Sequence, residues 1–285
     1  MEPTGGLRPV DPVDRAHLTG RSRPSPPIHR YAPSDHLAGL VERYWIPVWS
    51  LAEPSIQSTL QHPVCLVVIS NTYARLYGVA RGRSSVTLEG DGWAVCTMLT
   101  PAAGRLVLGR SVATLTDEWV DLADVLPTTH TGLVAAVRAA MEPDPHAVAS
   151  HERAIAAVED WLSTYLPLDE PGVAVNHLVG WLQEHPEVTR VSEVATAVGM
   201  SERSLQRLVE QRIGLSPKWL IQRRRLHDAV EALKAGTSTS LADVAADLGY
   251  TDQAHFTHDF RAVTGMTPGE YLRDQPTPPP EEDAG

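Results

Sequence analysis

The sequence has no apolar run long enough to cross a membrane. Its longest uninterrupted apolar stretch covers residues 64–69, far short of the ~20 residues that a transmembrane helix needs. The first residues are rich in proline and arginine and lack the apolar stretch of a secretory signal. We therefore expect no membrane partner and a location in the cytoplasm.

Cysteine is also scarce, because Cys65 and Cys96 are the only two in the chain. Two cysteines so far apart build neither a disulfide framework nor a zinc cage, and we interpret them as half-buried thiols. In the β-rich half, His36 and His62 are isolated and show none of the HxH, HxxxH or HExxH spacings of a metal site. The sequence therefore predicts no metal and no cofactor.

An excess of basic residues is missing as well. The chain of 285 residues has 24 Lys and Arg against 35 Asp and Glu, which gives a net charge of −11. Taken alone, this balance argues against nucleic acid as a partner, because phosphate binding depends on Lys and Arg. The length and the 42% of hydrophobic residues predict one large or two ordinary soluble domains.

The hydrophobic pattern changes along the chain from strand-like to helical. Short β-type runs at 64–70, 74–80, 84–89 and 93–99 are separated by turn residues such as Gly90-Asp91-Gly92, which predicts a small barrel or sandwich. Helical periodicity begins at His130 and returns at 151–166. The stripe in the second helix fits a dimer contact and packing on its own domain equally well; it consists of Ile155, Val158, Leu162 and Tyr165.

Prolines at 167 and 171 mark the boundary to an all-helical region. We expect a disordered arm at 1–30, a β-rich domain with C-terminal helices at 31–166, a linker at 167–171, a helical domain at 172–275 and a disordered tail at 276–285. The fold class is therefore α+β with two domains.

The helical region contains a repeat. Residues 191–201 (VSEVATAVGMS) match residues 241–251 (LADVAADLGYT) at an offset of 50, and after one insertion Leu205, Val209 and Pro217 match Phe256, Phe260 and Pro268. Each copy has the parts of a helix-turn-helix, with a small alanine where two helices meet and a glycine at the turn. A supersecondary unit is therefore used twice.

In each copy the second helix follows a residue suited to N-capping, Ser201 or Thr251. At ~100° per residue, Leu205, Leu208 and Val209 face inward in the first copy, as do Phe256, Phe260 and Val263 in the second. In the major groove, arginine can bind guanine and glutamine can bind adenine, each through a pair of hydrogen bonds. The outward positions that we expect to contact bases are Arg203, Gln206, Arg207, Gln253, Ala254, Thr257 and His258.

Residues 217–235 predict one helix of ~28 Å between the two copies, which could place two reading helices about one DNA turn apart. This helix carries the densest basic cluster of the sequence. The residues that we expect to contact the DNA backbone are Ser201, Lys218, Arg223, Arg224, Arg225, Thr251 and Arg261.

On these motifs the C-terminal hundred residues resemble the DNA-binding domain of the AraC/XylS family of bacterial transcription regulators. The segment LADVAADLGYTDQAHFTHDFRAVTGMTPGEYLR fits the family's signature almost throughout. The resemblance implies two helix-turn-helix units joined by a linker helix and places the base contacts on the outward positions named above. His258 departs from the pattern, since the family often has arginine there, so we expect the second half-site to be read weakly or mainly through backbone contacts.

Residues 98–126 more faintly resemble the end of a cupin-like sensor domain found in some of these regulators. That resemblance implies a β-barrel that binds a small molecule, dimerises, or does both. Aromatic residues are common in small-molecule sites, so Trp45, Trp49, Tyr77 and Trp93, with His62, are candidates for an effector pocket. For the aromatic residues, packing in the barrel core is the alternative that we weigh more heavily.

Within residues 172–275, eleven basic groups oppose thirteen acidic ones, so DNA affinity would have to come from their placement. We therefore predict a non-enzymatic, sequence-specific transcription regulator whose partners are double-stranded DNA, an effector, a second copy of the chain and RNA polymerase. The alternatives are a metal-dependent cupin enzyme and a DNA-alkylation repair protein with a helix-turn-helix module. Both lack the clustered Cys or His residues that they require.

Overall fold

The computed structural model describes residues 7–8, 26–235 and 240–274. The expected tail at 276–285 and most of the expected arm at 1–30 lie outside these residues. Strand β1 covers Ile28–Tyr31, so regular structure already begins within the segment that the sequence assigned to the arm.

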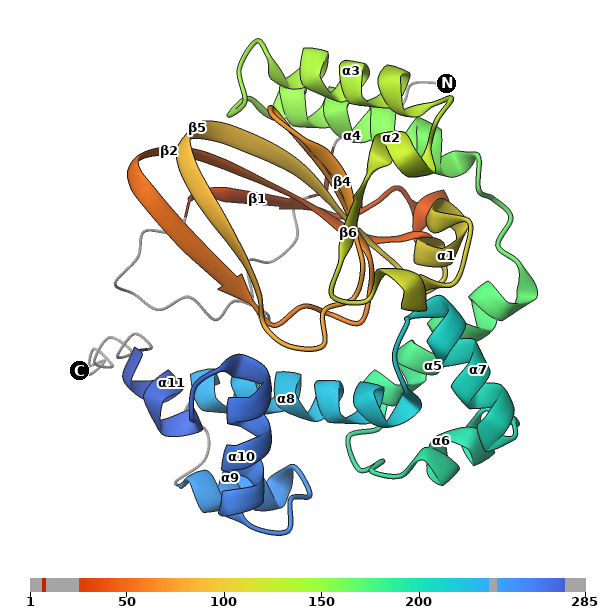
Figure 1. Ribbon diagram of the computed structural model, residues 1–285, viewed down its shortest axis with the longest axis vertical. Helices are drawn as coiled ribbons and strands as arrows, with labels where there is room; N and C mark the ends of the chain where they lie inside the picture. Colours follow the sequence, from red (N-terminus) through yellow and green to blue (C-terminus); the bar gives the residue numbers. More distant parts are fainter. Residues whose placement is uncertain (1–6, 9–25, 236–239, 275–285) are drawn as a thin grey trace, which may run out of the picture.

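Six strands form one antiparallel sheet that curls strongly (Figure 1). The two longest strands, β2 (Val41–Thr59) and β5 (Ser84–Leu99), are neighbours in it. The full order is β1-β2-β5-β3-β4-β6, where β3 is Leu66–Ser70, β4 is Ala74–Tyr77 and β6 is Trp119–Asp121. The predicted β-rich unit is therefore confirmed, and among the described strands β1 and β6 are the sheet edges.

One predicted break is wrong. Gly90, Asp91 and Gly92 lie inside β5, which joins the two runs that the sequence analysis separated. Gly90 has φ = 55° and faces a register shift in β2 between Leu51 and Ser55. A glycine at positive φ opposite such a shift is typical of a β-bulge, which bends a strand without ending it.

The sheet has one face in the main hydrophobic core and one that is more open. Along β2, Tyr44, Ile46 and Val48 belong to the core, whereas Trp45 and Trp49 lie on the other face. This alternation follows from the two-residue period of a strand. Helices α3 (His130–Met141) and α4 (Val148–Ser163) cover the core face, at the top of Figure 1.

The stripe on α4 packs against its own domain. Ile155, Val158 and Leu162 are fully buried in the main core, and Tyr165 is half-buried just beyond the helix. The first of the two alternatives left open by the sequence, a dimer contact through this stripe, is therefore not supported.

The remaining short helices before residue 130 are α1 (Ala103–Leu108), η1 (Asp35–Leu37), η2 (Val112–Leu115) and α2 (Leu122–Val125).

Residues beyond 166 are helical, as predicted. Helix α8 runs beneath the sheet in Figure 1, with α6 and α7 toward one end and α9, α10 and α11 toward the other. The bounds are α5 (Glu170–Glu184), α6 (Val191–Ala197), α7 (Glu202–Arg212), α8 (Pro217–Ala235), α9 (Leu241–Asp247), α10 (Gln253–Thr264) and α11 (Pro268–Asp274). The single linker helix predicted at 217–235 is confirmed.

Candidate nucleic-acid interface

The first helix-turn-helix consists of α6, a turn and α7. Gly199 has φ = 67° in the turn, and the Ser201 hydroxyl accepts a hydrogen bond from the Ser204 amide at 3.2 Å. Leu205 and Val209 are fully buried. Arg203, Gln206 and Arg207 are exposed on the opposite side of the helix, so the sequence-predicted reading face of this unit is open to solvent.

The second unit repeats this arrangement with α9 and α10. Gly249 has φ = 70°, and Phe256 and Phe260 are fully buried. Four candidate residues lie on the outer side of α10, where Gln253, Ala254 and His258 are exposed and Thr257 is half-buried. Both outward faces that the repeat predicted are therefore on the molecular surface.

The cap of α10 is one residue later than predicted. The Asp252 carboxylate accepts a hydrogen bond from the His255 amide at 2.8 Å, whereas Thr251 lies exposed before the cap. Asp252 gives α10 a negative charge next to its N-terminus, which stabilises the helix. Thr251 keeps its exposed hydroxyl and stays a candidate for a backbone contact.

The basic cluster on α8 is placed differently from the prediction. Arg223 is 2% exposed and donates to the carbonyl oxygens of Arg81 at 2.6 Å and Ala80 at 3.0 Å. Arg224 is 7% exposed and donates to the Val188 carbonyl at 2.9 Å. In this arrangement neither guanidinium faces a DNA surface.

Arg225, the third member of this cluster, is half-buried. Its guanidinium donates to the Leu248 carbonyl at 2.9 Å and lies 3.8 Å from the centre of the Tyr250 ring. The three arginines thus join α8 to three separate loops. The run of three arginines suggested phosphate contacts, because the local sequence does not show that loops of the protein pack around this part of α8.

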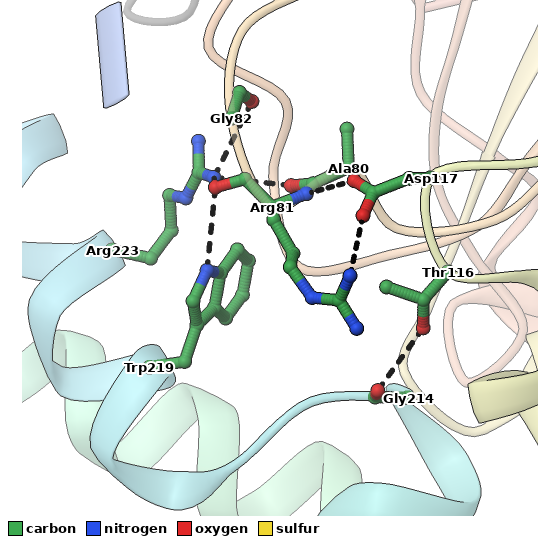
Figure 2. A network of polar contacts seen from close by, with 8 residues as sticks. All are labelled: Ala80, Arg81, Gly82, Thr116, Asp117, Gly214, Trp219 and Arg223. Carbon is green, nitrogen blue, oxygen red and sulfur yellow. Dashed lines mark hydrogen bonds and ion pairs between the residues drawn. The ribbon is translucent and has the colours of Figure 1, made fainter. Parts of the chain in front are cut away.

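Arg223 is part of a polar network between the two halves of the chain (Figure 2). Trp219 Nε1 donates to the Arg81 carbonyl at 3.4 Å, and Arg81 in turn pairs with Asp117 at 2.9 Å. Burial lowers the pKa of Arg223 to about 10, still well above neutral pH, so the side chain stays charged. The first helix-turn-helix unit also contacts this region, because the Thr116 hydroxyl donates a hydrogen bond to the Gly214 carbonyl at 3.0 Å.

Gly214 is required at this contact. Its φ is 92°, and a Cβ atom built there would lie 2.6 Å from Thr116 Oγ1 and 3.1 Å from the Ala113 amide nitrogen. A side chain would therefore be strained by its backbone conformation and would clash with the loop around η2. The end of α7 can approach the N-terminal half this closely because residue 214 is glycine.

The basic residues that remain on the surface are fewer than the sequence suggested. Of the predicted backbone contacts, Ser201, Lys218, Thr251 and Arg261 are exposed. Lys218 and Arg261, together with Arg203 and Arg207, leave positive charge on α7, on the first turn of α8 and on α10. Affinity for DNA would therefore depend on these few cations rather than on a broad basic surface.

A cavity of about 500 Å³ lies over the open face of the sheet. Four of the five candidate effector residues line it, which are Trp45, Trp49, His62 and Tyr77. Trp93 instead packs in the main core, because it is paired with Val48 across β2 and β5, whereas Trp45 is paired with Cys96. Three arginines and two further aromatic residues of the lining were not predicted from the sequence, which are Arg30, Arg43, Arg75, Tyr73 and Trp119.

A second cavity, of about 280 Å³, lies between the sheet and helices α5 and α8. Arg43, His62 and Met98 line both cavities. The His62 ring stacks on His227 of α8, with 4.5 Å between ring centres and 7° between planes. The wall of the larger cavity is thus in direct contact with the linker helix.

The described residues contain no group of three or more His, Cys, Asp or Glu arranged to hold a metal ion. Cys65 and Cys96 are both buried, and burial raises the pKa of Cys65 to about 12. In the described part of the chain, no helix is both long and apolar enough to span a bilayer.

The two halves of the chain match different families of known proteins. Residues 194–274 match the family described as a helix-turn-helix domain, and residues 29–121 match a family described as a domain of unknown function. The HTH-type transcriptional activator RhaS of Escherichia fergusonii is 33% identical over 97 residues, which are 34% of this chain and 34% of that protein. The transcriptional activator NphR of a Rhodococcus species is 32% identical over 90 residues, 32% of this chain and 26% of that protein.

The chain spans about a third of the length of the curated relatives it matches. Among solved structures, an AraC-type transcriptional regulator of Chromobacterium violaceum is 26% identical, with 37% of this chain and 95% of that chain covered at a TM-score of 0.35. An apo form of ToxT from Vibrio cholerae is 13% identical, with 81% and 97% covered at a TM-score of 0.41.

Proposed function

We propose that the chain is a sequence-specific DNA-binding transcription regulator, because residues 194–274 match a helix-turn-helix domain and the chain is similar to part of the transcriptional activator RhaS. The observation that carries this proposal is the pair of capped helices α7 and α10, which present exposed polar faces from two copies of one motif joined by one rigid helix. The pair could enter two adjacent segments of the major groove, as the two halves of a helix-turn-helix dimer do.

In this proposal α7 is the stronger reader. Arg203 and Arg207 would grip guanine and Gln206 would pair with adenine. Helix α10 would make weaker contacts with bases through Gln253, Ala254, Thr257 and His258. The phosphate contacts would come from the exposed Ser201, Lys218, Thr251 and Arg261, while Arg223, Arg224 and Arg225 would hold α8 in place.

The N-terminal half would be the sensor. Its cavity has the size of a small-molecule site, and the contacts of the N-terminal half with α7 and α8 give an effector a route to both reading helices. We extend the proposal to a homodimer and to contact with RNA polymerase, the latter because RhaS and NphR are activators. An effector would favour one arrangement of the two halves by about 1–3 kcal/mol.

Selection from a pool of random-sequence duplexes at two salt concentrations tests this function in the full chain. We expect the retained duplexes to share two half-sites about 10 base pairs apart. Retention by the folded chain without a shared sequence would contradict the proposed specificity.

The Arg207→Ala variant tests whether the exposed face of α7 contacts bases. We expect affinity for the selected duplex to fall about 10- to 100-fold, with little change for unrelated duplexes. Arg110→Ala is the matched control, since Arg110 is exposed but lies on the N-terminal half. Equal loss on all duplexes would assign Arg207 to a phosphate instead of a base.

A further inference from the structure

The cavity on the open face of the sheet has a chemistry that points to one class of ligand. Its apolar walls combine aliphatic residues such as Leu66 and Val68 with five flat side chains, which are Trp45, Trp49, Tyr73, Tyr77 and Trp119. Aromatic side chains favour stacking and edge contacts with other flat rings. A volume of about 500 Å³ is ample for a ligand of one to three rings.

The charged groups of the cavity are all of one sign. Three arginines, Arg30, Arg43 and Arg75, line it together with His62, and no Asp or Glu is found among its described lining residues. The chain as a whole has the opposite balance, with a net charge of −11. These guanidinium groups would repel a cation, whereas they would attract an anion.

Arg75 lies in the lining of this site and is held against two aromatic rings. Its guanidinium carbon lies 3.5 Å from the centre of the Trp119 ring and 4.8 Å from that of Tyr73. The Asp121 carboxylate is 3.5 Å from Arg75 Nε and restrains the group from outside the cavity lining. A guanidinium fixed in this way presents the fork geometry that carboxylates accept, with little further loss of rotational freedom.

We propose that this cavity binds an organic anion with a flat, aromatic body, whose carboxylate is held by the arginines and whose ring stacks among the tryptophans and tyrosines. The inference rests on the proposed sensor role of the N-terminal half and gives that site a ligand class. Burial raises the pKa of Tyr73, so its phenol stays protonated and adds a neutral donor to the site.

Matched pairs of ligands test the need for charge. Benzoate with benzamide and 2-naphthoate with 2-naphthamide are titrated into the full chain by isothermal calorimetry up to millimolar concentration. We expect saturable binding of an acid, and binding of its amide at least about tenfold weaker, because a hydrogen bond to a charged group is worth more than a neutral one. Octanoate is expected to bind more weakly than 2-naphthoate, since it lacks a flat ring.

Variants assign the binding to this cavity. Arg75→Gln should abolish most of the preference for acid over amide, and Trp119→Ala should weaken both members of a pair. The second variant keeps the test valid if the first does not fold, since Trp119 is 44% exposed on an edge strand. Arg110→Gln, which removes an exposed charge away from the cavity, should change neither.

Equal affinity for acid and amide, tighter binding of octanoate, or no binding by the folded chain would each overturn the inference. The DNA selection described above is run on the same preparation. A chain that selects a DNA sequence without preferring acids refutes only the ligand class. A chain that prefers acids but selects no DNA refutes only the proposed regulator.

Discussion

The first helix-turn-helix unit shares the main hydrophobic core of the sheet, whereas the second packs into a core of its own. Leu205, Val209 and Ile213 belong to the cluster that contains the sheet and α4, and α7 packs directly against α1 and η2. Phe256 and Phe260 instead belong to a separate cluster with the second half of α8 and with α11. Leu60, just after β2, is the described residue of the N-terminal half that joins this second cluster.

Two copies of one motif are therefore attached to the rest of the molecule in different ways. A rearrangement in the sheet domain would act on α7 through direct packing, and on α10 through α8 and through the loop at 82–83, which lies beside Val263 and Gly265. Similar sequence patterns do not imply equal coupling to a sensor, because coupling depends on which core each unit shares. Four changes test this comparison, from the largest expected effect to the smallest.

Phe260→Ala should have the largest effect, costing about 3–5 kcal/mol, because it leaves a cavity in the second core. We expect hydrogen exchange by mass spectrometry to show lost protection in α9, α10 and α11, with α6 and α7 unchanged. Leu205→Ala is the matched control and should instead reduce protection in the first unit and the sheet. Equal loss in both units after Phe260→Ala would show that the two cores unfold as one.

Arg223→Met should reduce the stability of the whole chain by about 1–3 kcal/mol. Methionine keeps much of the apolar stem but leaves the carbonyl groups of Ala80 and Arg81 without their buried donor. Unfolding in urea measures the change. Arg203→Met removes an exposed arginine and should change stability by less than about 0.5 kcal/mol, so similar values for the two variants would contradict the structural role of Arg223.

Asp169→Asn should have a smaller effect, about 1 kcal/mol at neutral pH, because Asp169 is partly exposed and solvent screens its pair with the buried Arg212. Asparagine can still cap α5, so the variant isolates the ion pair. The hydrogen bond from Arg212 lowers the pKa of Asp169. The pair therefore contributes fully above the unfolded pKa of about 4, and this contribution is lost as pH falls through the lower folded value.

Urea unfolding of the wild type and Asp169→Asn between pH 3 and pH 7 checks the sign of this dependence. The two proteins should differ most near neutral pH and converge in acid. A difference that grows as pH falls would show that another group is responsible.

His258→Ala should have the smallest effect, within about threefold in affinity for the selected duplex, since we expect α10 to be the weaker reader. His258→Arg should increase affinity, because arginine offers paired donors to guanine or to phosphate. Gel-shift titrations of both variants beside Arg207→Ala measure the ratio between the units. A loss from His258→Ala as large as that from Arg207→Ala would show that the two units read DNA equally.

Local signals predicted the helical half well. The glycines at positive φ, the Ser201 cap and the 217–235 helix all depend on short-range backbone chemistry that is visible in the repeat. The buried positions of Phe256 and Phe260 follow from helical periodicity. These features need no knowledge of the rest of the molecule.

What the sequence could not show depends on contacts distant in the chain. Trp93 and Trp45 are both aromatic strand residues, and only the register of β2 with β5 places them on opposite faces. The run Arg223 to Arg225 looks like a basic surface until the loop at 80–82 is brought against it. The three arginines of the cavity come from three different strands, so no local motif marks them.

The two cavities share a wall, so a ligand bound in the proposed site and DNA bound at the reading helices would affect each other reciprocally. Arg43 and His62 face the proposed ligand on one side and the α8 region on the other. If a bound acid alters the affinity of the chain for its operator by some factor, the operator must alter affinity for the acid by the same factor. The DNA-bound protein and the free protein would then have different dissociation constants for the acid. The two forms would therefore become occupied over different ranges of acid concentration.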